Sequence, residues 1–365
     1  MAATWTYLVE DPILDLVVAQ DVDLVDVTIE ETLGGRGTLT AKLPLASAHA
    51  TDDIVAEGRR GFYALRDGVI QWGGLLWDAP VGMGSDTFDL HCDSWLDYWD
   101  HRTIWHSRTF TDTEQFTIYK TLVDDAQNPA DALAGNPLDL GIDVVWDAAS
   151  GITRTIVDQY LDHQARNLGD ALRTLAASEN GFDRAMEYDL GSETITKRTR
   201  LYYPRKGTVP EPGGAPHFEF EFDSSPTSKT NVLRRGIERT ARTTAHRVRG
   251  WGEGSDVSRL RAQVIDPAGN GYPPLDAAPD WSTESVQANL DARTREFTTR
   301  VNHTLRLPQI EVDMNADPKW GSYQLGDQIR ADILDRGASF SGDARIIGWR
   351  LFPERDVAVL TLEEV

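Results

Sequence analysis

Alternating apolar and polar residues dominate the first hundred positions and predict antiparallel strands. Residues 25–30 alternate apolar with acidic or hydroxyl side chains. After the turn at Gly34–Gly37, residues 38–43 alternate threonine or lysine with apolar side chains. A period of two places the apolar side chains on one face of a strand, and a glycine-rich turn favours a hairpin. The sequence therefore predicts a hairpin with one solvent-facing side, within a β region that spans residues 22–105.

Two segments between residues 106 and 205 change to helical spacing. The first follows the capping candidates Thr111 and Thr113 and ends near Asn128–Pro129, because proline cannot continue a helix. The second begins at Asn167 and ends at Asn180–Gly181, and its apolar residues recur on one helical face. Residues 130–141, between the two helices, are expected to be loop.

The rest of the chain returns to β patterning and carries one more helix. Residues 217–222 alternate phenylalanine with polar residues and predict a strand, as do residues 310–314. The third helix is expected to begin at Ser282, whose hydroxyl can cap the first turn. The Pro- and Gly-rich residues 208–216 are expected to form a linker, and residues 267–279 another loop.

A pattern in the first quarter recurs at the C-terminus. Both stretches contain a glycine, an apolar run, an aspartate-glycine turn, two further apolar runs and a proline; they span residues 58–90 and 326–360, with extra loop residues 338–341 in the second. Two related β units in one chain indicate a pseudo-symmetric building block, which is typical of proteins that assemble.

Composition narrows the class of protein. A chain of 365 residues with 40% apolar content is expected to form two or three domains. No apolar run reaches the roughly 20 residues of a membrane helix, and the first residues lack the pattern of a secretory signal. The single cysteine, Cys92, excludes an internal disulfide and suits synthesis in a reducing compartment such as the cytoplasm.

Charge argues against ordinary nucleic-acid binding. Thirty-six basic and 58 acidic side chains give a formal net charge of −22, so the molecule repels phosphates. Residues 234–261 are the exception, since this stretch contains eight arginines and only three acidic residues. On an acidic protein we favour pairing of this stretch with carboxylates of the chain itself or of a neighbouring subunit.

The sequence offers no catalytic, cofactor or metal motif. The cluster His91-Cys92-Asp93, with His101 and His106, could be imagined as a metal site, but the intervening Trp and Leu residues favour structural histidines. Fifty-eight carboxylates make any one catalytic pair impossible to nominate. Eleven tryptophans could include a sugar platform, although they fit core and interface positions better.

A family resemblance begins at residues 167–207, where a helix leads through a Gly-Phe-Asp segment and a hairpin to a Tyr-Pro-Arg-Lys-Gly close. Further stretches lie at residues 245–254, 271–276, 323–327 and 345–349. The residues that we single out for this pattern are Gly181, Phe182, Tyr203, Pro204, Arg205, Gly271, Tyr272, Pro273, Leu275, Asp276, Gly326, Asp327, Gly348 and Trp349. In this order they resemble the minor tail proteins of long-tailed, non-contractile (siphovirus-type) phages of actinobacteria.

The resemblance implies a β-rich α+β fold with two tail-tube-like antiparallel β-barrels and inserted helix-containing α+β material. We expect a first barrel from residues 1–105 with 217–250, an inserted domain at 106–207, a linker at 208–216 and a second barrel at 251–365 with a helix at about 282–303. Two equivalent barrels per chain would let three chains match a sixfold tube, which would account for the duplication.

The resemblance also implies a function in the virion, at the distal end of the tail. It implies a baseplate or tail-tip hub that is a homotrimer, with the tail tube protein or distal tail protein ring, other tail-tip or central fibre proteins, and the tape measure protein as partners. DNA would pass through its lumen without specific binding, and no cofactor or enzymatic activity is expected, since the chain ends after the last strand without a lytic module. Two alternatives stay open: a distal-tail or receptor-binding protein that contacts host cell-surface carbohydrate, and a tail-associated peptidoglycan hydrolase.

Overall fold

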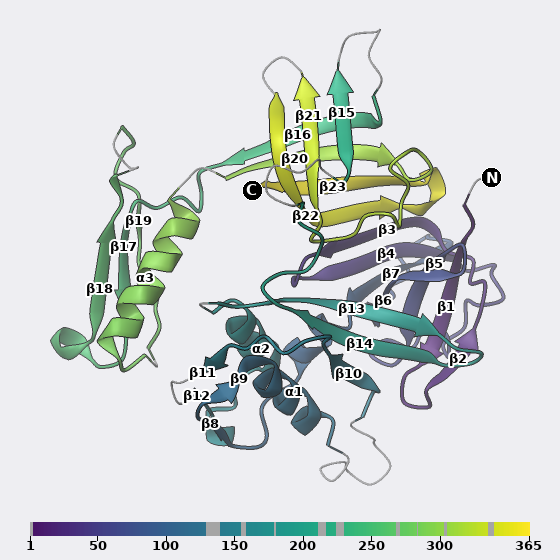
Figure 1. Ribbon diagram of the computed structural model, residues 1–365. Coiled ribbons are helices and arrows are strands. Elements are labelled where there is room, and N and C mark those ends of the chain that lie inside the picture. The colour runs from purple at the N-terminus through teal and green to yellow at the C-terminus, as the bar shows by residue number, and fades with distance from the viewer. Residues whose placement is uncertain are drawn as a thin grey trace. The chain divides into compact units, whose positions relative to one another are not determined.

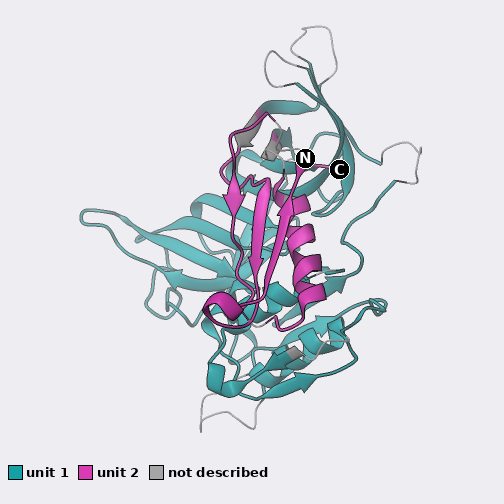
Figure 2. Ribbon diagram, turned by 90° about the vertical axis from the view of Figure 1, so that its left-hand side faces the viewer, with its two compact units in different colours: residues 1–235, 310–363, 365 teal, residues 236–309, 364 magenta. Residues whose placement is uncertain are grey.

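The computed structural model describes residues 3–128, 139–154, 158–178, 180–210, 217–223, 230–267, 271–282, 284–302, 305–334 and 339–365. The chain divides into two compact units, residues 1–235 with 310–363 and 365, and residues 236–309 with 364 (Figures 1 and 2). The predicted β-rich α+β fold class is confirmed, because strands dominate and α-helices are few within the described chain.

The first β module comes from the N-terminal hundred residues. Its strands are β1 (Trp5–Asp11), β2 (Leu16–Ala19), β3 (Val25–Thr32), β4 (Gly37–Pro44), β5 (Gly61–Arg66), β6 (Val69–Asp78) and β7 (Thr87–Ser94). They are ordered β3-β4-β7-β6-β5-β1-β2. The predicted first hairpin is confirmed: Ile29 pairs with Leu39 across β3 and β4, and both side chains are fully buried.

The second β module has the same strand order. Its strands are β15 (Glu219–Asp223), β16 (Val232–Thr240), β20 (Leu305–Asp313), β21 (Gln328–Leu334), β22 (Phe340–Phe352) and β23 (Val357–Glu364). The order β16-β20-β23-β22-β21-β15 matches β3-β4-β7-β6-β5-β1 position by position. One departure is that β15 runs parallel to β21, whereas β1 runs antiparallel to β5. The turn expected at residues 335–337 lies outside the described residues.

The long strand β22 joins the two modules into one sheet (Figure 1). Residues 340–345 pair with β21, and residues 348–351 pair antiparallel with β3 of the first module. Apolar residues of both modules, among them Ile29, Phe62, Ile310 and Ile346, are fully buried and belong to one continuous core. The modules therefore share both hydrogen bonds and apolar burial, which is the dominant stabilising term in folding.

An α+β segment is inserted between β7 and β15. It contains η1 (Asp97–His101), β8 (Arg108–Phe110), β9 (Thr113–Glu114), α1 (Gln115–Ala126), β10 (Ile142–Val145), β11 (Thr153–Arg154), β12 (Asp158–Tyr160), η3 (Asp162–Gln164), α2 (Leu168–Ala176), β13 (Asp183–Leu190) and β14 (Ile195–Tyr202). Strands β10, β14 and β13 form a small sheet. Apolar faces of α1 and α2 pack in a second core with Trp95 and Trp99.

The two predicted helices of this segment are confirmed, but one cap is different. Asn167 caps α2 as predicted, since its Oδ1 accepts a hydrogen bond from the amide of Asp170 (2.9 Å). The cap of α1 is Glu114 instead of Thr111 or Thr113, because the Glu114 carboxylate accepts from the Thr117 amide (3.0 Å). Glu114 is one residue nearer to the helix than Thr113, and its longer side chain brings a carboxylate oxygen to the Thr117 amide in the first turn of the helix.

The second unit has its own sheet and helix. The sheet has the order β18-β17-β19, with β17 at Arg247–Trp251, β18 at Arg261–Ile265 and β19 at Asp276–Ala277. The unit also contains α3 (Gln287–Val301) and η4 (Asp256–Ser258). The remaining short helix, η6 (Pro353–Arg355), lies in the first unit. The expectation that α3 begins at Ser282 is wrong. The helix begins at Gln287, because the buried Glu284 carboxylate accepts from the Val286 amide (3.2 Å) and holds the preceding turn outside the helix.

The predicted domain limits of 106, 208 and 251 remain a prediction. By contact density, residues 106–207 stay with the first unit, and α3 falls in the unit of residues 236–309. Within the described chain, no helix is both long and apolar enough to cross a membrane.

A buried ion pair fastens the inserted segment to the first module. Lys197 Nζ of β14 lies 2.6 Å from Glu10 Oε1 of β1, and both side chains are almost completely buried. Tyr63 also donates its hydroxyl hydrogen to Glu10, and Trp95 Nε1 donates to the Tyr63 hydroxyl (3.0 Å). Burial raises the pKa of the Glu10 carboxyl, while the hydrogen bonds from Lys197 and Tyr63 oppose that rise.

We expect Lys197→Met to lower the free energy of unfolding by about 3–5 kcal/mol, because it leaves the Glu10 charge buried without its partner. Adding Glu10→Gln removes the buried charge and should restore a substantial part of the loss. Urea denaturation of wild type, single and double variants measures both effects. A double variant no more stable than Lys197→Met would contradict the role given to this pair.

Candidate functional site at the module junction

The chain leaves the inserted segment at a junction with the second β module. Residues 203–208, which follow β14, lie against residues 324–328, which lead into β21. Asp327 joins them: its Oδ1 accepts from the Thr208 amide (2.7 Å) and its Oδ2 from the Gln324 amide (2.9 Å). The Gln328 amide donates to the Thr208 carbonyl (3.0 Å). We call residues 203–208 and 324–328, with the side chains that hold them, the junction.

Two glycines let the two segments of the junction touch. Gly207 has a φ of +94° and Gly326 a φ of +95°, which only glycine adopts readily. A Cβ on Gly207 would lie 2.1 Å from the carbonyl carbon of Gly326, and one on Gly326 would lie 2.5 Å from the Lys206 oxygen. Any side chain at either position would force the two backbones apart.

Arg345 of β22 ties three parts of the chain together at the junction. Its Nε donates to the Gly326 carbonyl (3.1 Å), and its Nη2 donates to the Lys206 carbonyl (3.0 Å) and to the Asp183 carboxylate. The same carboxylate accepts from the Lys206 amide (2.7 Å). A planar guanidinium with several fixed donors suits this task better than a lysine ammonium.

Lys206 and Glu31 place opposite charges in the buried part of the junction. The Lys206 side chain is buried; its Nζ donates to Gln324 Oε1 (2.6 Å) and lies 5.2 Å from the centre of the Tyr202 ring. Burial lowers the pKa of Lys206, while Asp327 and Glu31 oppose that change. Burial also raises the pKa of the half-buried Glu31 to about 7, against the opposing effects of Lys206 and Trp349.

Half of the residues singled out by the resemblance lie in or beside the junction. They are Tyr203, Pro204, Arg205, Gly326, Asp327, Gly348 and Trp349. Arg205 Nη2 donates to Gln328 Oε1 (3.1 Å). Gly348 pairs with Thr32 and Trp349 with Glu31 across the β22–β3 seam. The Trp349 ring also packs on Trp320, with 4.6 Å between ring centres.

The other half lies in two separate places. Gly181 and Phe182 follow α2, where the Phe182 ring packs edge-on against Phe116 (5.0 Å between centres) in the core of the inserted segment. The remaining residues, Gly271, Tyr272, Pro273, Leu275 and Asp276, belong to the second unit. There the Leu275 carbonyl accepts from two successive amides, and Asp276 forms an ion pair with Arg247 (3.2 Å).

Not every residue of the junction was singled out from the sequence. Asp183, Lys206 and Gly207 lie inside the Gly-Phe-Asp and Tyr-Pro-Arg-Lys-Gly segments of the resemblance but had no role assigned, and Glu31 had no signal beyond its place in an alternating strand. Arg345 is part of the repeated stretch, but two of its partners, Asp183 and Lys206, lie more than 100 residues away.

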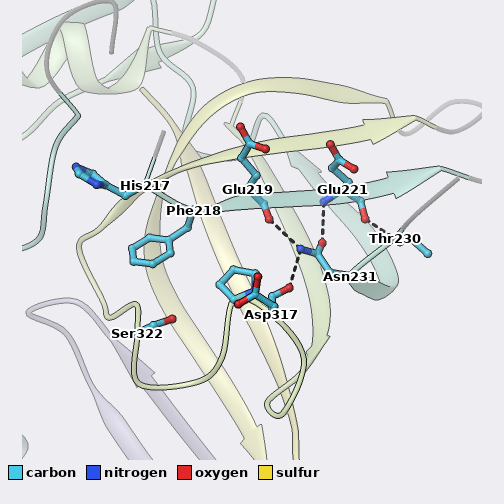
Figure 3. Close-up of a pocket in the computed structure, with 9 residues that line it drawn as sticks. His217, Phe218, Glu219, Glu221, Thr230, Asn231, Asp317 and Ser322 are labelled. Atoms are coloured by element: carbon cyan, nitrogen blue, oxygen red, sulfur yellow. Dashed lines mark hydrogen bonds between the residues drawn. The ribbon is translucent and has the colours of Figure 1, made fainter. Parts of the chain in front are cut away.

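A polar pocket of about 670 Å³ lies beside β15 (Figure 3). Asn231 spans it: its Nδ2 donates to the carbonyls of Glu219 (2.9 Å) and Asp317 (3.1 Å), and its Oδ1 accepts from the Glu221 amide (2.8 Å). The carboxylates of Glu219 and Glu221 point away from Asn231 (Figure 3). The Asn231 side chain thus supplies hydrogen-bond partners to the backbone amide and carbonyl groups of β15, as a neighbouring strand would. We therefore assign Asn231 a structural role.

The histidine cluster considered from the sequence does not converge on one point. Cys92 is fully buried, His91 Nε2 lies 3.3 Å from Asp93 Oδ1, and the His101 ring stacks on Trp77 with 3.9 Å between centres. Among the residues that the structure describes, no group of three His, Cys, Asp or Glu could hold a metal ion.

Comparison with solved protein structures finds folds that match this chain over nearly its whole length. The 43 kDa tail protein of prophage MuSo2 from Shewanella oneidensis superposes with a TM-score of 0.63 at 10% identity, covering 99% of this chain and 98% of that one. The chain has the fold of phage tail proteins. The tail protein from Neisseria meningitidis MC58 (TM-score 0.60, 14% identity, 99% and 96% covered) has it too. So does prophage tail protein gp18 from Listeria monocytogenes EGD-e (0.54, 9%, 98% and 93%).

Sequence comparison by itself finds neither a family model nor a curated protein that matches. The likeness therefore rests on the fold and not on shared residues. It supports the phage-tail part of the resemblance and leaves the actinobacterial and siphovirus type as a prediction.

We expect Gly207→Ala to destabilise the protein more than Gly321→Ala does. Gly321 is a matched control, because its φ is +90° and an added Cβ would meet nothing within 4 Å. The control should cost about 1–2 kcal/mol through backbone strain, and the overlap with Gly326 should add roughly 1–3 kcal/mol. Equal losses in chemical denaturation would contradict the close approach described here.

We expect Glu31→Gln to stabilise the protein at neutral and alkaline pH. Burial raises the pKa of Glu31 from its ordinary value of 4.5 to about 7 in the folded protein, so the stability associated with protonated Glu31 is complete below pH 4.5 and lost as pH rises through 7. The gain from Gln should be absent at pH 4, grow between pH 4.5 and 7, and reach the order of 1 kcal/mol above it. Denaturation at several pH values measures this, with the exposed Glu57→Gln as control; a gain that does not vary with pH would rule it out.

Proposed function

We propose that this chain is a structural hub protein of a phage tail tip or baseplate. It assembles as a homotrimer that continues and closes the hexameric tail tube, anchors other tip proteins and leaves a lumen for DNA. The supporting observation is that two β modules with the same strand order lie in one chain that has the fold of phage tail proteins.

The duplication explains how a trimer meets a hexamer. Three chains with two modules each offer six equivalent positions, so one ring can present threefold symmetry to the tip and near-sixfold symmetry to the tube. The net charge of −22 suits a lumen in which DNA moves without adhering, because like charges repel. The tail tube or distal tail protein ring, fibre proteins and the tape measure protein are the expected partners, at the distal end of the virion tail.

The geometry of the described polar groups supports a role without catalysis. The pocket beside β15 has its Asn231 committed to backbone hydrogen bonds. A cleared band in a peptidoglycan zymogram of the purified chain would favour the hydrolase alternative over the structural one.

One observation keeps the carbohydrate-binding alternative in view. Trp105 is 75% exposed, which is unusual for so large an apolar side chain and is the kind of surface on which a sugar ring stacks. Binding to a glycan array that is lost in Trp105→Ala would favour a receptor-binding role.

The mass of the assembled particle tests the main proposal. We expect three copies of the 40.6 kDa chain in light scattering, and a ring of three chains with six similar modules in cryo-electron microscopy. Because assembly depends on concentration and partners, the measurement is made with and without the tail tube protein. A monomer under both conditions, or a ring of another symmetry, would overturn the proposal.

A further inference from the structure

Strands β6 and β22 correspond residue by residue. Gly61 pairs with Leu75 where the β5–β6 ladder ends, and Gln328 pairs with Arg345 where the β21–β22 ladder ends. The next residue makes the same pair of backbone hydrogen bonds in each strand. The Leu76 carbonyl accepts from the amide of residue 58 and its amide donates to the carbonyl of residue 60. The Ile346 carbonyl and amide do the same with residues 326 and 327. Leu76 therefore corresponds to Ile346, and the residues that follow can be compared in register.

Strands β3 and β16 correspond in the same way. Each occupies the first position of its module's strand order. The sequence Ile-Glu-Glu-Thr at residues 29–32 also returns as Ile-Glu-Arg-Thr at residues 237–240. Aligned on these residues, Val25 corresponds to Leu233 and Asp26 to Arg234.

Within the chain, the end of β22 covers the edge of β3. Residues 348–351 pair antiparallel with residues 32–29, and Arg350 Nε lies 2.6 Å from Glu30 Oε1. Beyond the ladder, Glu354 accepts from the Asp26 amide (2.5 Å). One module thereby supplies the strand that the edge of the other requires.

The equivalent pair of edges is left open in the described chain. β6 bonds to the β5 side only as far as Leu76. Of the residues that follow, Trp77 and Ala79 pack inward, whereas Val81 is 44% exposed and Met83 is fully exposed. β16 ends the strand order, and Leu233 on it is 51% exposed. An open strand edge beside exposed apolar side chains is a ready template for pairing with another chain.

We propose that β16 of one copy pairs with residues 77–83 at the end of β6 of a second copy, and so repeats between chains the β22–β3 seam found within the chain. The inference rests on the proposed function, since it specifies the contact that builds the trimer. Each copy offers one edge of each kind, so the contact is head-to-tail, the type that forms a ring of three when each copy is rotated by one third of a turn from the last. The register brings Leu233 and the exposed Arg234 to the loop of residues 82–86, which carries Met83 and Asp86.

The other strand edge of the second module is less suited to this contact. The backbone of β15 is already satisfied by Asn231, whose side chain bonds to Glu219 and Glu221. A partner strand would have to displace both of these hydrogen bonds. At β16 the partner would cover exposed apolar surface instead.

Cross-linking tests the contact without disturbing the core. Met83→Cys and Leu233→Cys both fall on exposed residues, and the only native thiol, Cys92, is fully buried. The two single variants are mixed, assembled under the conditions that give trimers and treated with a short bismaleimide. We expect a covalent dimer from the mixture and a covalent trimer from the double variant. The control uses Val69→Cys in place of Met83→Cys, because Val69 is also exposed. The yield of cross-linked product should be at least tenfold above that of the control.

The outcomes separate this inference from the function on which it rests. Trimers that cross-link no more than the Val69 control overturn the edge pairing and leave the hub proposal intact. Failure of the wild-type chain to form trimers, alone or with the tail tube protein, overturns the hub proposal. Cross-linking confined to single chains overturns the pairing as well.

Discussion

The structure depends on strand β22, which extends beyond the second module and pairs with a strand of the first. The first half of β22 completes the second module through β21, and its second half supplies the missing neighbour of β3 in the first. An uncovered edge would leave a row of backbone donors and acceptors that are costly to bury without partners. The seam also lets residues from both modules share one apolar core, so the two copies of the duplicated unit form a continuous sheet.

The inserted segment is fixed to this sheet at two places of different chemistry. The buried pair of Glu10 and Lys197 holds β14 to β1, and the junction around Arg345 and Asp327 holds the end of the same hairpin to the second module. Buried ion pairs contribute little net stability but are costly to break, so they favour one arrangement over others. In the ring that we propose, where each chain must present equivalent surfaces, a fixed arrangement matters more than additional stability.

The likeness to phage tail proteins persists at 9–14% identity because strand order and burial can be kept by many sequences. Apolar residues of similar volume exchange freely in a core, and outward-facing residues are free to change. The positions that cannot change freely are those with a backbone requirement, such as Gly207 and Gly326, where the two segments touch. Positions of that kind are few, and they leave only a faint trace in the sequence.

Local pattern in the sequence determined the β-rich class, the first hairpin, the strand around Phe220, the helix that Asn167 caps and the duplication itself, because periodicity, capping and turn residues act over a few positions. It misplaced the caps of α1 and α3, where a carboxylate a few residues away competed with the expected hydroxyl. Of the residues singled out for the resemblance, seven lie in or beside the junction. Asp183 and Lys206 stood in the same segments of the resemblance without an assigned role, and the part played by Glu31 could not be predicted. Only the tertiary structure decided which distant segments meet, since the pairing of β22 with β3 and the contact of Gly207 with Gly326 join residues more than 100 positions apart, a separation at which no local pattern specifies a partner.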